Sequence, residues 1–200
     1  MNQKALGPMD ATPARSLRFL LCDTAGKVGG LSSSDEAWVS SPIQCLDKAV
    51  DAKPGLIVIR IGDMPFRERD TLVELSAALK RNPHTRNCPI LALLHSMHRK
   101  LLEDLNRAGV GFVKFIGDCT LDSDQIRQII DAMGPHDRLE RYLETVCPFV
   151  HYRQIDSRHE MVSCGAYLDR MVLGGLRLHE LCQTIGHLHC EYYLNPRRKS

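Results

Sequence analysis

The sequence lacks both kinds of apolar segment that direct a chain into or across a membrane. The first sixteen residues contain no apolar core of the kind found in a signal peptide. Nowhere in the 200 residues does an apolar run approach the ~20 residues needed to span a bilayer. We therefore expect a cytoplasmic protein without membrane contact, in which residues 1–15 form a disordered N-terminal tail.

An excess of charge of either sign is also lacking. The formal net charge is +2, and the one basic run, 197–199, stands at the end of the chain. Neither feature indicates a polyanionic partner, and no helix-turn-helix pattern with a basic recognition face is present. We therefore expect no nucleic-acid partner. With 44% hydrophobic and 25% charged residues, the chain has the composition of a globular protein that buries a core without disulfides.

A phosphate-binding loop is missing as well. The stretch DTAGKVGGLSSSDE, residues 23–36, contains Gly26 and Lys27, but Val28 follows where a P-loop has serine or threonine. No glycine stands five residues before Gly26. The glycine and serine content instead predicts a turn or a short hairpin.

The first two thirds of the chain carry an α/β pattern. Short apolar runs with the length of buried parallel strands occur at 16–23, 55–61, 88–94 and 111–116, with a weaker edge strand at 37–41. Segments of helical periodicity separate them. This alternation predicts a parallel sheet with helices on both faces, whose ligands bind at the carboxyl ends of the strands.

The order of these segments resembles the receiver domain of bacterial two-component response regulators, over residues 16–134. KPGLIVIRIGDMPFRERD (53–70) resembles the third strand and its loop, NPHTRNCPILALLHS (82–96) the fourth strand, and NRAGVGFVKF (106–115) the approach to the fifth. The resemblance implies a flavodoxin-like sheet, a role in signal transduction, and a protein partner that binds this domain.

Most of the phosphotransfer positions that the resemblance implies are altered. Cys22 and Asp23 stand at the family's acidic pair, and its phospho-acceptor position corresponds to Arg60 or Ile61, while Lys114 matches its lysine. Phosphoryl transfer needs Mg²⁺ held by carboxylates, and an arginine brings a cation to that place instead. We expect Arg60 to pair with Asp23 and hold the domain in one state, as in a pseudo-receiver.

One acid near this site remains an alternative phospho-acceptor. Asp63 lies in the loop after the third strand, where its carboxylate has to reach back to the site. The family's switch serine or threonine corresponds to Leu94, with Ser96 two places later. A phosphorylatable receiver that uses Asp63 is therefore a further hypothesis.

The eight cysteines fall into two groups. In a cytoplasmic chain they indicate thiols, metal ligands or redox groups rather than a disulfide framework. Four are isolated and fit small core residues, Cys22, Cys45, Cys88 and Cys119. The other four crowd into the last quarter, Cys147, Cys164, Cys182 and Cys190.

The second group falls in a region where segments 137–146, 159–173 and 176–185 have helical periodicity. We therefore expect a small helical module over 135–200. A module of this size has a small core and often needs docking or a metal for stability.

The spacing of the second group is C-x16-C-x17-C-x7-C, without the close C-x2–4-C pair of structural zinc sites. Wide spacing on helices suits a [4Fe–4S] cluster, which takes one thiolate at each corner. Zinc bound by Cys182, Cys190, an upstream cysteine and either His187 or His189 is an alternative. Buried thiols without metal, or a catalytic cysteine, are the others.

Together these patterns predict a non-enzymatic regulatory protein. Its receiver-like domain serves as a docking or dimerisation platform, for a protein partner or a second copy of the chain. The four-cysteine module senses redox state or iron, or stabilises the fold. An electron-transfer or accessory subunit of a redox complex is the alternative function.

Overall fold

The computed structural model describes residues 17–26, 34–117 and 119–197. The predicted N-terminal tail and residues 27–33 of the glycine- and serine-rich stretch after the first strand lie outside these residues.

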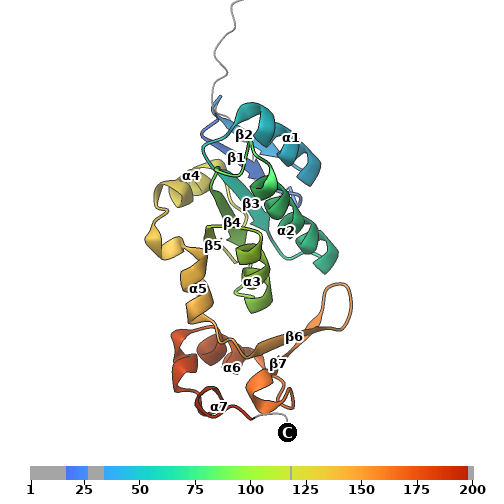
Figure 1. The fold of residues 1–200 in the computed structure, drawn as a ribbon, viewed down its shortest axis with the longest axis vertical. Helices are drawn as coiled ribbons and strands as arrows, with labels where there is room; N and C mark the ends of the chain where they lie inside the picture. Colours follow the sequence, from blue (N-terminus) through green and yellow to red (C-terminus); the bar gives the residue numbers. More distant parts are fainter. Residues whose placement is uncertain (1–16, 27–33, 118, 198–200) are drawn as a thin grey trace, which may run out of the picture.

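A parallel sheet of five strands forms the first region (Figure 1). Its strands are β1 (Phe19–Cys22), β2 (Glu36–Val39), β3 (Ile57–Ile61), β4 (Ile90–Leu94) and β5 (Phe112–Phe115). They lie in the order β2-β1-β3-β4-β5, and every neighbouring pair is parallel. This is the doubly wound order 2-1-3-4-5 of flavodoxin-like folds, so the predicted α/β class is confirmed.

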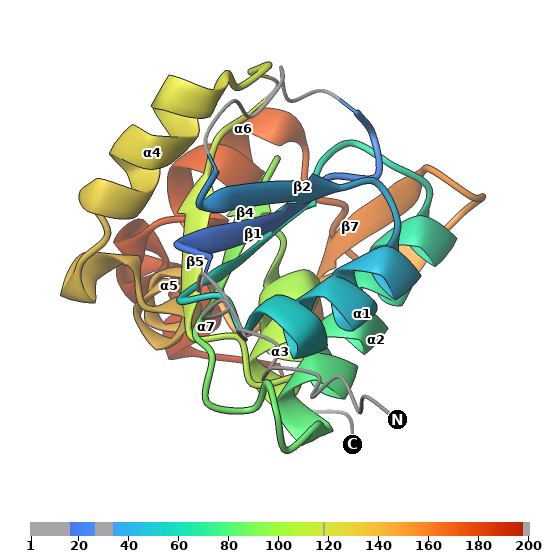
Figure 2. The ribbon, with the colours of Figure 1, turned by 90° about the horizontal axis from the view of Figure 1, so that it is seen from above.

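Helices cover both faces of the sheet, unevenly. They are α1 (Pro42–Ala52), α2 (Phe66–Arg81), α3 (Arg99–Arg107) and α4 (Ser123–Asp131). Figure 2 shows α1, α2 and α3 on one face and α4 on the other. Local sequence sets the helix starts: Pro42 suits the first turn of α1, and the Ser41 hydroxyl accepts a hydrogen bond from the amide of Gln44.

The central strands are apolar on both sides because helices bury both faces. All residues of β1, β3 and β4 are buried. Ile57, Ile59 and Ile61 point to the α1–α3 side, and Val58 belongs to the core on the α4 side. Arg60, also in β3, is the one charged residue within these three strands.

The C-terminal region follows α5 (Leu139–Thr145). It contains the antiparallel hairpin β6 (Val150–Gln154) and β7 (Glu160–Cys164), and the short helices α6 (Gly175–Arg177) and α7 (Glu191–Leu194). A helical C-terminal region is thus confirmed, but the helix expected over 159–173 is wrong, because only Gly165–Tyr167 form a short 3-10 turn there. Residues Glu160–Cys164 form a strand because Val150–Gln154 supplies the cross-strand partner, and that earlier strand was not recognised.

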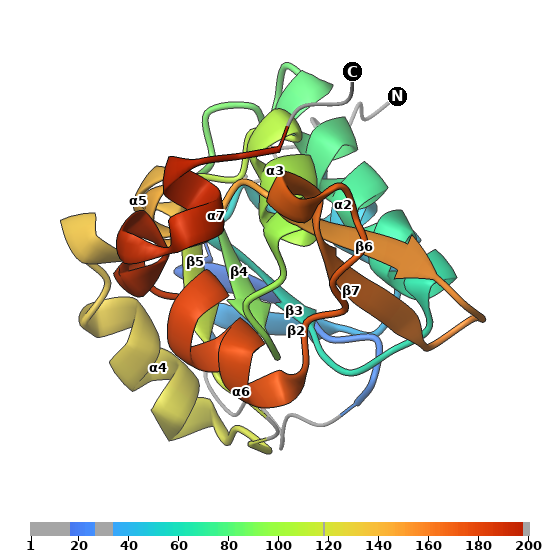
Figure 3. The ribbon, with the colours of Figure 1, turned by 90° about the horizontal axis from the view of Figure 1, so that it is seen from below.

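The C-terminal region packs against the carboxyl ends of β3 and β4 (Figure 3). In the hairpin turn, the Ser157 carbonyl accepts a hydrogen bond from the amide of Phe66, the first residue of α2, at 3.0 Å. Glu160 accepts one from His98 Nε2 at 2.5 Å, and Gln183 donates to the Met97 carbonyl. The edge of the sheet where ligands usually bind is therefore partly covered by the chain itself.

No helix among the described residues has the length and apolar character required to cross a membrane.

Candidate functional site

The receiver-like positions lie at the carboxyl edge of the sheet. Asp23 follows β1 and Arg60 belongs to β3, and their side chains are 1% and 2% exposed. Arg60 Nη1 lies 3.6 Å from Asp23 Oδ1, and Nη2 donates to the Cys119 carbonyl at 3.2 Å. The predicted pair of Arg60 with Asp23 is therefore present.

The carboxylate of Asp23 balances the buried positive charge of Arg60. Within the described residues, Nε and Nη1 of Arg60 make no hydrogen bond, although both atoms are buried. An uncompensated charge in the interior is strongly unfavourable, and the carboxylate of Asp23 is the compensating charge. The pair is thus a fixed structural element of the sheet edge.

Asp63 occupies a different environment. It is exposed in the loop between β3 and α2, and it lines a cavity of about 170 Å³ together with Arg69, His95 and Arg158. The hairpin closes one side of this cavity. Asp23 is buried while Asp63 is exposed, so the structure does not bring the two carboxylates together in one buried site.

Lys114 forms an ion pair with Asp137. Its Nζ lies 3.0 Å from Oδ1 of Asp137, whose side chain is 2% exposed and also accepts a hydrogen bond from the Gly134 amide. Asp137 belongs to the turn that leads into α5. The lysine therefore anchors the connection between the sheet and the C-terminal region.

Three of the four cysteines of the last quarter, far apart in sequence, gather in one place. Cys147, Cys164 and Cys182 are buried in a single apolar cluster with Val150 and Leu173. Cys190 is half-buried and directly precedes α7. The C-terminal chain thus folds back so that three of the four predicted thiols share one buried cluster.

Different local structures position these cysteines. Cys147 follows α5, and its amide donates to the Cys182 carbonyl at 2.8 Å. Cys164 ends β7, Cys182 ends a π-helical turn that starts at Leu178, and Cys190 precedes α7. A π-helical turn is rare in proteins and is frequent at functional sites.

The backbone after Cys164 is strained. Leu168 and Asp169 have φ values of 60° and 59°, in the left-handed region that ordinary L-residues rarely adopt. The Asp169 amide donates to the Cys164 carbonyl at 3.0 Å, and its carboxylate accepts hydrogen bonds from Ser163 and His151. These contacts hold the turn next to Cys164 despite its conformational cost.

The environment of the thiols disfavours thiolates when no cation is present. Burial, together with the neighbouring Cys147, Cys164 and Cys190, raises the pKa of Cys182 to about 11. Burial also raises the pKa of Cys147, with Cys164 and Cys190 adding to the effect and Arg99 opposing it. Four thiolates at this position therefore need a positive partner.

Aromatic rings surround the cluster on its outer side. Tyr167 and Tyr192 meet edge to face at 4.9 Å between ring centroids, and Phe149 and Tyr193 at 5.9 Å. All four pack against the buried cluster that contains Cys147, Cys164 and Cys182. Such a shell limits access of water to the sulfur atoms.

The histidines do not complete a site for a single metal ion. His187 is buried and its Nδ1 donates to the Thr184 carbonyl at 2.7 Å, whereas His189 is exposed. In the part of the chain that the structure describes, no group of three or more His, Cys, Asp or Glu side chains could hold one metal ion. The zinc alternative therefore gains no support from these positions.

Sequence reasoning missed Arg99 and Asp137. Arg99 connects α3 to the residue before Cys147, and Asp137 pairs with Lys114. Only the position of Asp137 beside the Gly134–Pro135 break gave a local signal, since such turns often carry capping acids. The partners of both residues are distant in sequence.

The chain is similar to solved structures of other proteins. One solved structure that the chain is similar to is the crystal structure of a response regulator from Desulfuromonas acetoxidans. The TM-score is 0.39 and the identity 21%, over 59% of this chain and 99% of that chain. No protein-family profile and no curated protein matches the sequence. The strand order, and not this likeness, carries the assignment to the flavodoxin-like class.

Proposed function

We propose that this chain is a non-enzymatic regulatory protein whose C-terminal region binds a [4Fe–4S] cluster through Cys147, Cys164, Cys182 and Cys190. The observation that supports the proposal is that Cys147, Cys164 and Cys182, far apart in sequence, lie in one buried cluster, while the half-buried Cys190 follows in the same C-terminal region. Each corner of such a cluster takes one thiolate, so its ligands stand further apart than the ligands of one ion.

The cluster supplies positive iron centres and one-electron redox chemistry when it is bound. The residues of the chain supply the rest. Cys147, Cys164, Cys182 and Cys190 would hold the cluster as thiolates. The rings of Phe149 and Tyr193 keep water from the sulfur atoms.

The receiver-like region acts without phosphorylation in this proposal. The ion pair of Arg60 with Asp23 occupies the position where Mg²⁺ has to bind, and Lys114 is bound to Asp137. A domain of this kind provides a surface for a protein partner or for a second copy of the chain. Sedimentation of the purified protein distinguishes a dimer from a monomer that awaits its partner.

Anaerobic reconstitution with iron and sulfide tests whether the four cysteines bind a cluster. We expect wild-type protein and the Cys119→Ser control to gain visible absorbance, and the Cys164→Ser variant to lose most of it. Equal absorbance of Cys164→Ser and wild type would exclude Cys164 as a ligand.

Incubation with a small-molecule phosphodonor and Mg²⁺ tests the receiver half. We expect no phosphoryl label on the protein. Stable labelling that disappears in the Asp63→Asn variant would establish the phosphorylatable receiver instead.

A further inference from the structure

The chain on the two sides of Val146 belongs to separate apolar cores. Leu139 and Val146 lie in the core on the α1–α3 side of the sheet, whereas the C-terminal cluster begins at Cys147. Among the described residues, no buried apolar cluster includes residues from both sides of the peptide bond between Val146 and Cys147. Each region can therefore keep its interior when the other moves.

Polar contacts join the β6–β7 hairpin to the starts of α2 and α3. The amide of Phe66, the first residue of α2, donates to the Ser157 carbonyl at 3.0 Å. The amide of Arg99, the first residue of α3, donates to the Tyr152 hydroxyl at 3.1 Å. The first amides of a helix have no acceptor within the helix. The hairpin therefore supplies the acceptor at the start of both helices.

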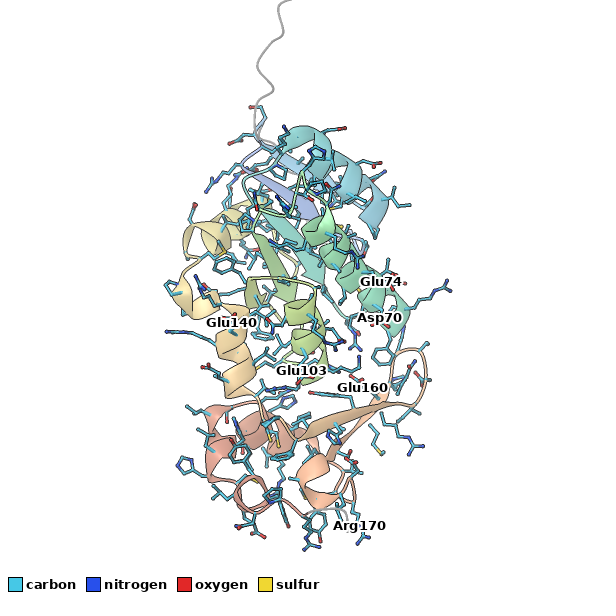
Figure 4. The ribbon with its side chains drawn as sticks, viewed as in Figure 1. Asp70, Glu74, Glu103, Glu140, Glu160 and Arg170 are labelled. Atoms are coloured by element: carbon cyan, nitrogen blue, oxygen red, sulfur yellow. The ribbon has the colours of Figure 1, made fainter. Side chains whose placement is uncertain are left out.

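Glu160 of β7 brings a carboxylate to the same contact, and Figure 4 shows it between the two regions. Its Oε1 accepts a hydrogen bond from His98 Nε2 at 2.5 Å and lies 3.9 Å from Arg69 Nη1. Nδ1 of His98 accepts from the Leu101 amide at 3.1 Å, so Nε2 is the nitrogen that donates. The His98 ring stacks on Tyr152 at 3.7 Å between centroids. One carboxylate and one ring thus connect both helices to both strands of the hairpin.

The hairpin covers a cavity at the carboxyl ends of β3 and β4. The cavity has a volume of about 170 Å³, and Asp63 after β3 and Ser96 after β4 line it. Arg158 and Glu160 of the hairpin complete the lining. Doubly wound folds bind their ligands at this edge of the sheet. Access to the edge therefore depends on the position of the hairpin.

We propose that the C-terminal region is a hinged cap, held closed by Glu160, which swings about the connection at Val146–Cys147 and uncovers the carboxyl edge of the sheet. Polar contacts between two regions of one chain commonly permit such movement. Opening breaks the hydrogen bonds between the hairpin and the two helices, and it leaves both cores and the β6–β7 ladder folded. The proposal does not depend on what the cysteines of the cap bind.

Native-state hydrogen exchange at increasing urea concentration, followed by NMR, tests the proposal on the wild-type protein. The swing of a folded cap exposes little surface, and the urea dependence of exchange scales with the surface exposed. We therefore expect the amides of Phe66 and Arg99 to exchange together, through an opening that depends only weakly on urea. The amides of β3, β4 and the β6–β7 ladder should stay protected under the same conditions.

Three results would overturn the proposal. If both amides exchange with the urea dependence of β4, the two regions separate only when the whole protein unfolds. If Phe66 exchanges without Arg99, only the hairpin turn frays, because Arg99 is bound to Tyr152 in the middle of β6. If Arg99 exchanges together with the β6–β7 ladder, the C-terminal region unfolds instead of swinging.

A pair of variants tests the role of Glu160. Glu160→Gln keeps the size of the side chain and removes its charge, and hydrogen bonds to charged groups are stronger than neutral ones. We expect the exchange of Phe66 and Arg99 to become roughly tenfold faster, although neither amide binds Glu160. Glu140→Gln is the matched control, because Glu140 is exposed on α5, and it should leave both rates unchanged. Equal rates in Glu160→Gln and wild type would refute the role of Glu160 in holding the cap closed.

Discussion

The two regions of this chain bury their interiors in different ways. On the α1–α3 side of the sheet, two of the twenty buried core residues are cysteines, whereas three of the six in the C-terminal cluster are. The C-terminal region also leaves large apolar side chains exposed, among them Ile155, Leu176 and Ile185. A sheet with a large apolar core is stable by itself. A region with so small an apolar core often needs a further stabilising element, such as a bound metal.

Removing one cysteine of the C-terminal cluster is the strongest test of this difference between the two cores. We expect Cys147→Ala to abolish iron binding and to expose residues 147–197 to proteases, because the region loses the bonds that its core cannot replace. Limited proteolysis with mass spectrometry locates the cleavage sites. Cys119→Ala, an exposed cysteine outside the cluster, serves as the control. Equal protection in both variants would show that the C-terminal region is stable without the cluster.

We also expect a large loss of stability when the ion pair of Arg60 with Asp23 is broken. Arg60→Ala leaves the buried carboxylate of Asp23 without its counter-charge, which costs about 3–5 kcal/mol in the free energy of unfolding. Urea denaturation measures this loss, and iron content should stay unchanged. The double variant Arg60→Met/Asp23→Leu should recover part of it, because apolar replacement of a buried pair is often neutral. A single variant as stable as wild type would contradict the structural role of the pair.

We expect a substitution in the core of the sheet to lower its stability by the same amount with and without iron. Leu93 is fully buried in β4, and Leu93→Ala removes apolar contacts and leaves a cavity. We expect a loss of about 2–5 kcal/mol in the free energy of unfolding of the sheet. The loss should be the same in iron-loaded and iron-free protein. A loss that depends on iron would mean that the two regions unfold as one unit.

The smallest expected loss of stability concerns Glu160, which connects the hairpin to His98 at the start of α3. Burial alone raises the pKa of Glu160, but the hydrogen bond from His98, with the charge of Arg69, holds it below its ordinary value. A carboxyl with a lowered pKa in the folded protein stabilises it above pH 4.5, and this contribution is lost as the pH falls through the folded pKa.

Glu160→Gln should therefore cost about 1–3 kcal/mol at neutral pH, and less in acid. Thermal unfolding between pH 3 and pH 7 measures the difference from wild type. Glu140→Gln is the matched control, because Glu140 is exposed on α5. A difference from wild type that grows as the pH falls would contradict the assigned pKa direction.

The sheet was predictable from the sequence because its signals are local. The apolar runs of β1, β3 and β4 have the length of buried strands, and their order fixes the doubly wound class. The pairing of Arg60 with Asp23 was predictable too, since the carboxyl ends of neighbouring parallel strands lie side by side.

The C-terminal region was predictable only in part. Its cysteines mark the candidate site by their spacing, but the strand Glu160–Cys164 depends on a partner that composition does not reveal. The role of Arg99 could not be foreseen, because its hydrogen bonds reach Leu143 and Val146, more than forty residues away. Contacts between distant segments form only when the regions dock.

The most direct test of the central claim is the iron and acid-labile sulfide content of the protein purified without oxygen. The account predicts a brown protein with about four iron and four sulfide per chain. A colourless, metal-free protein whose C-terminal region is folded and resistant to proteases would contradict it.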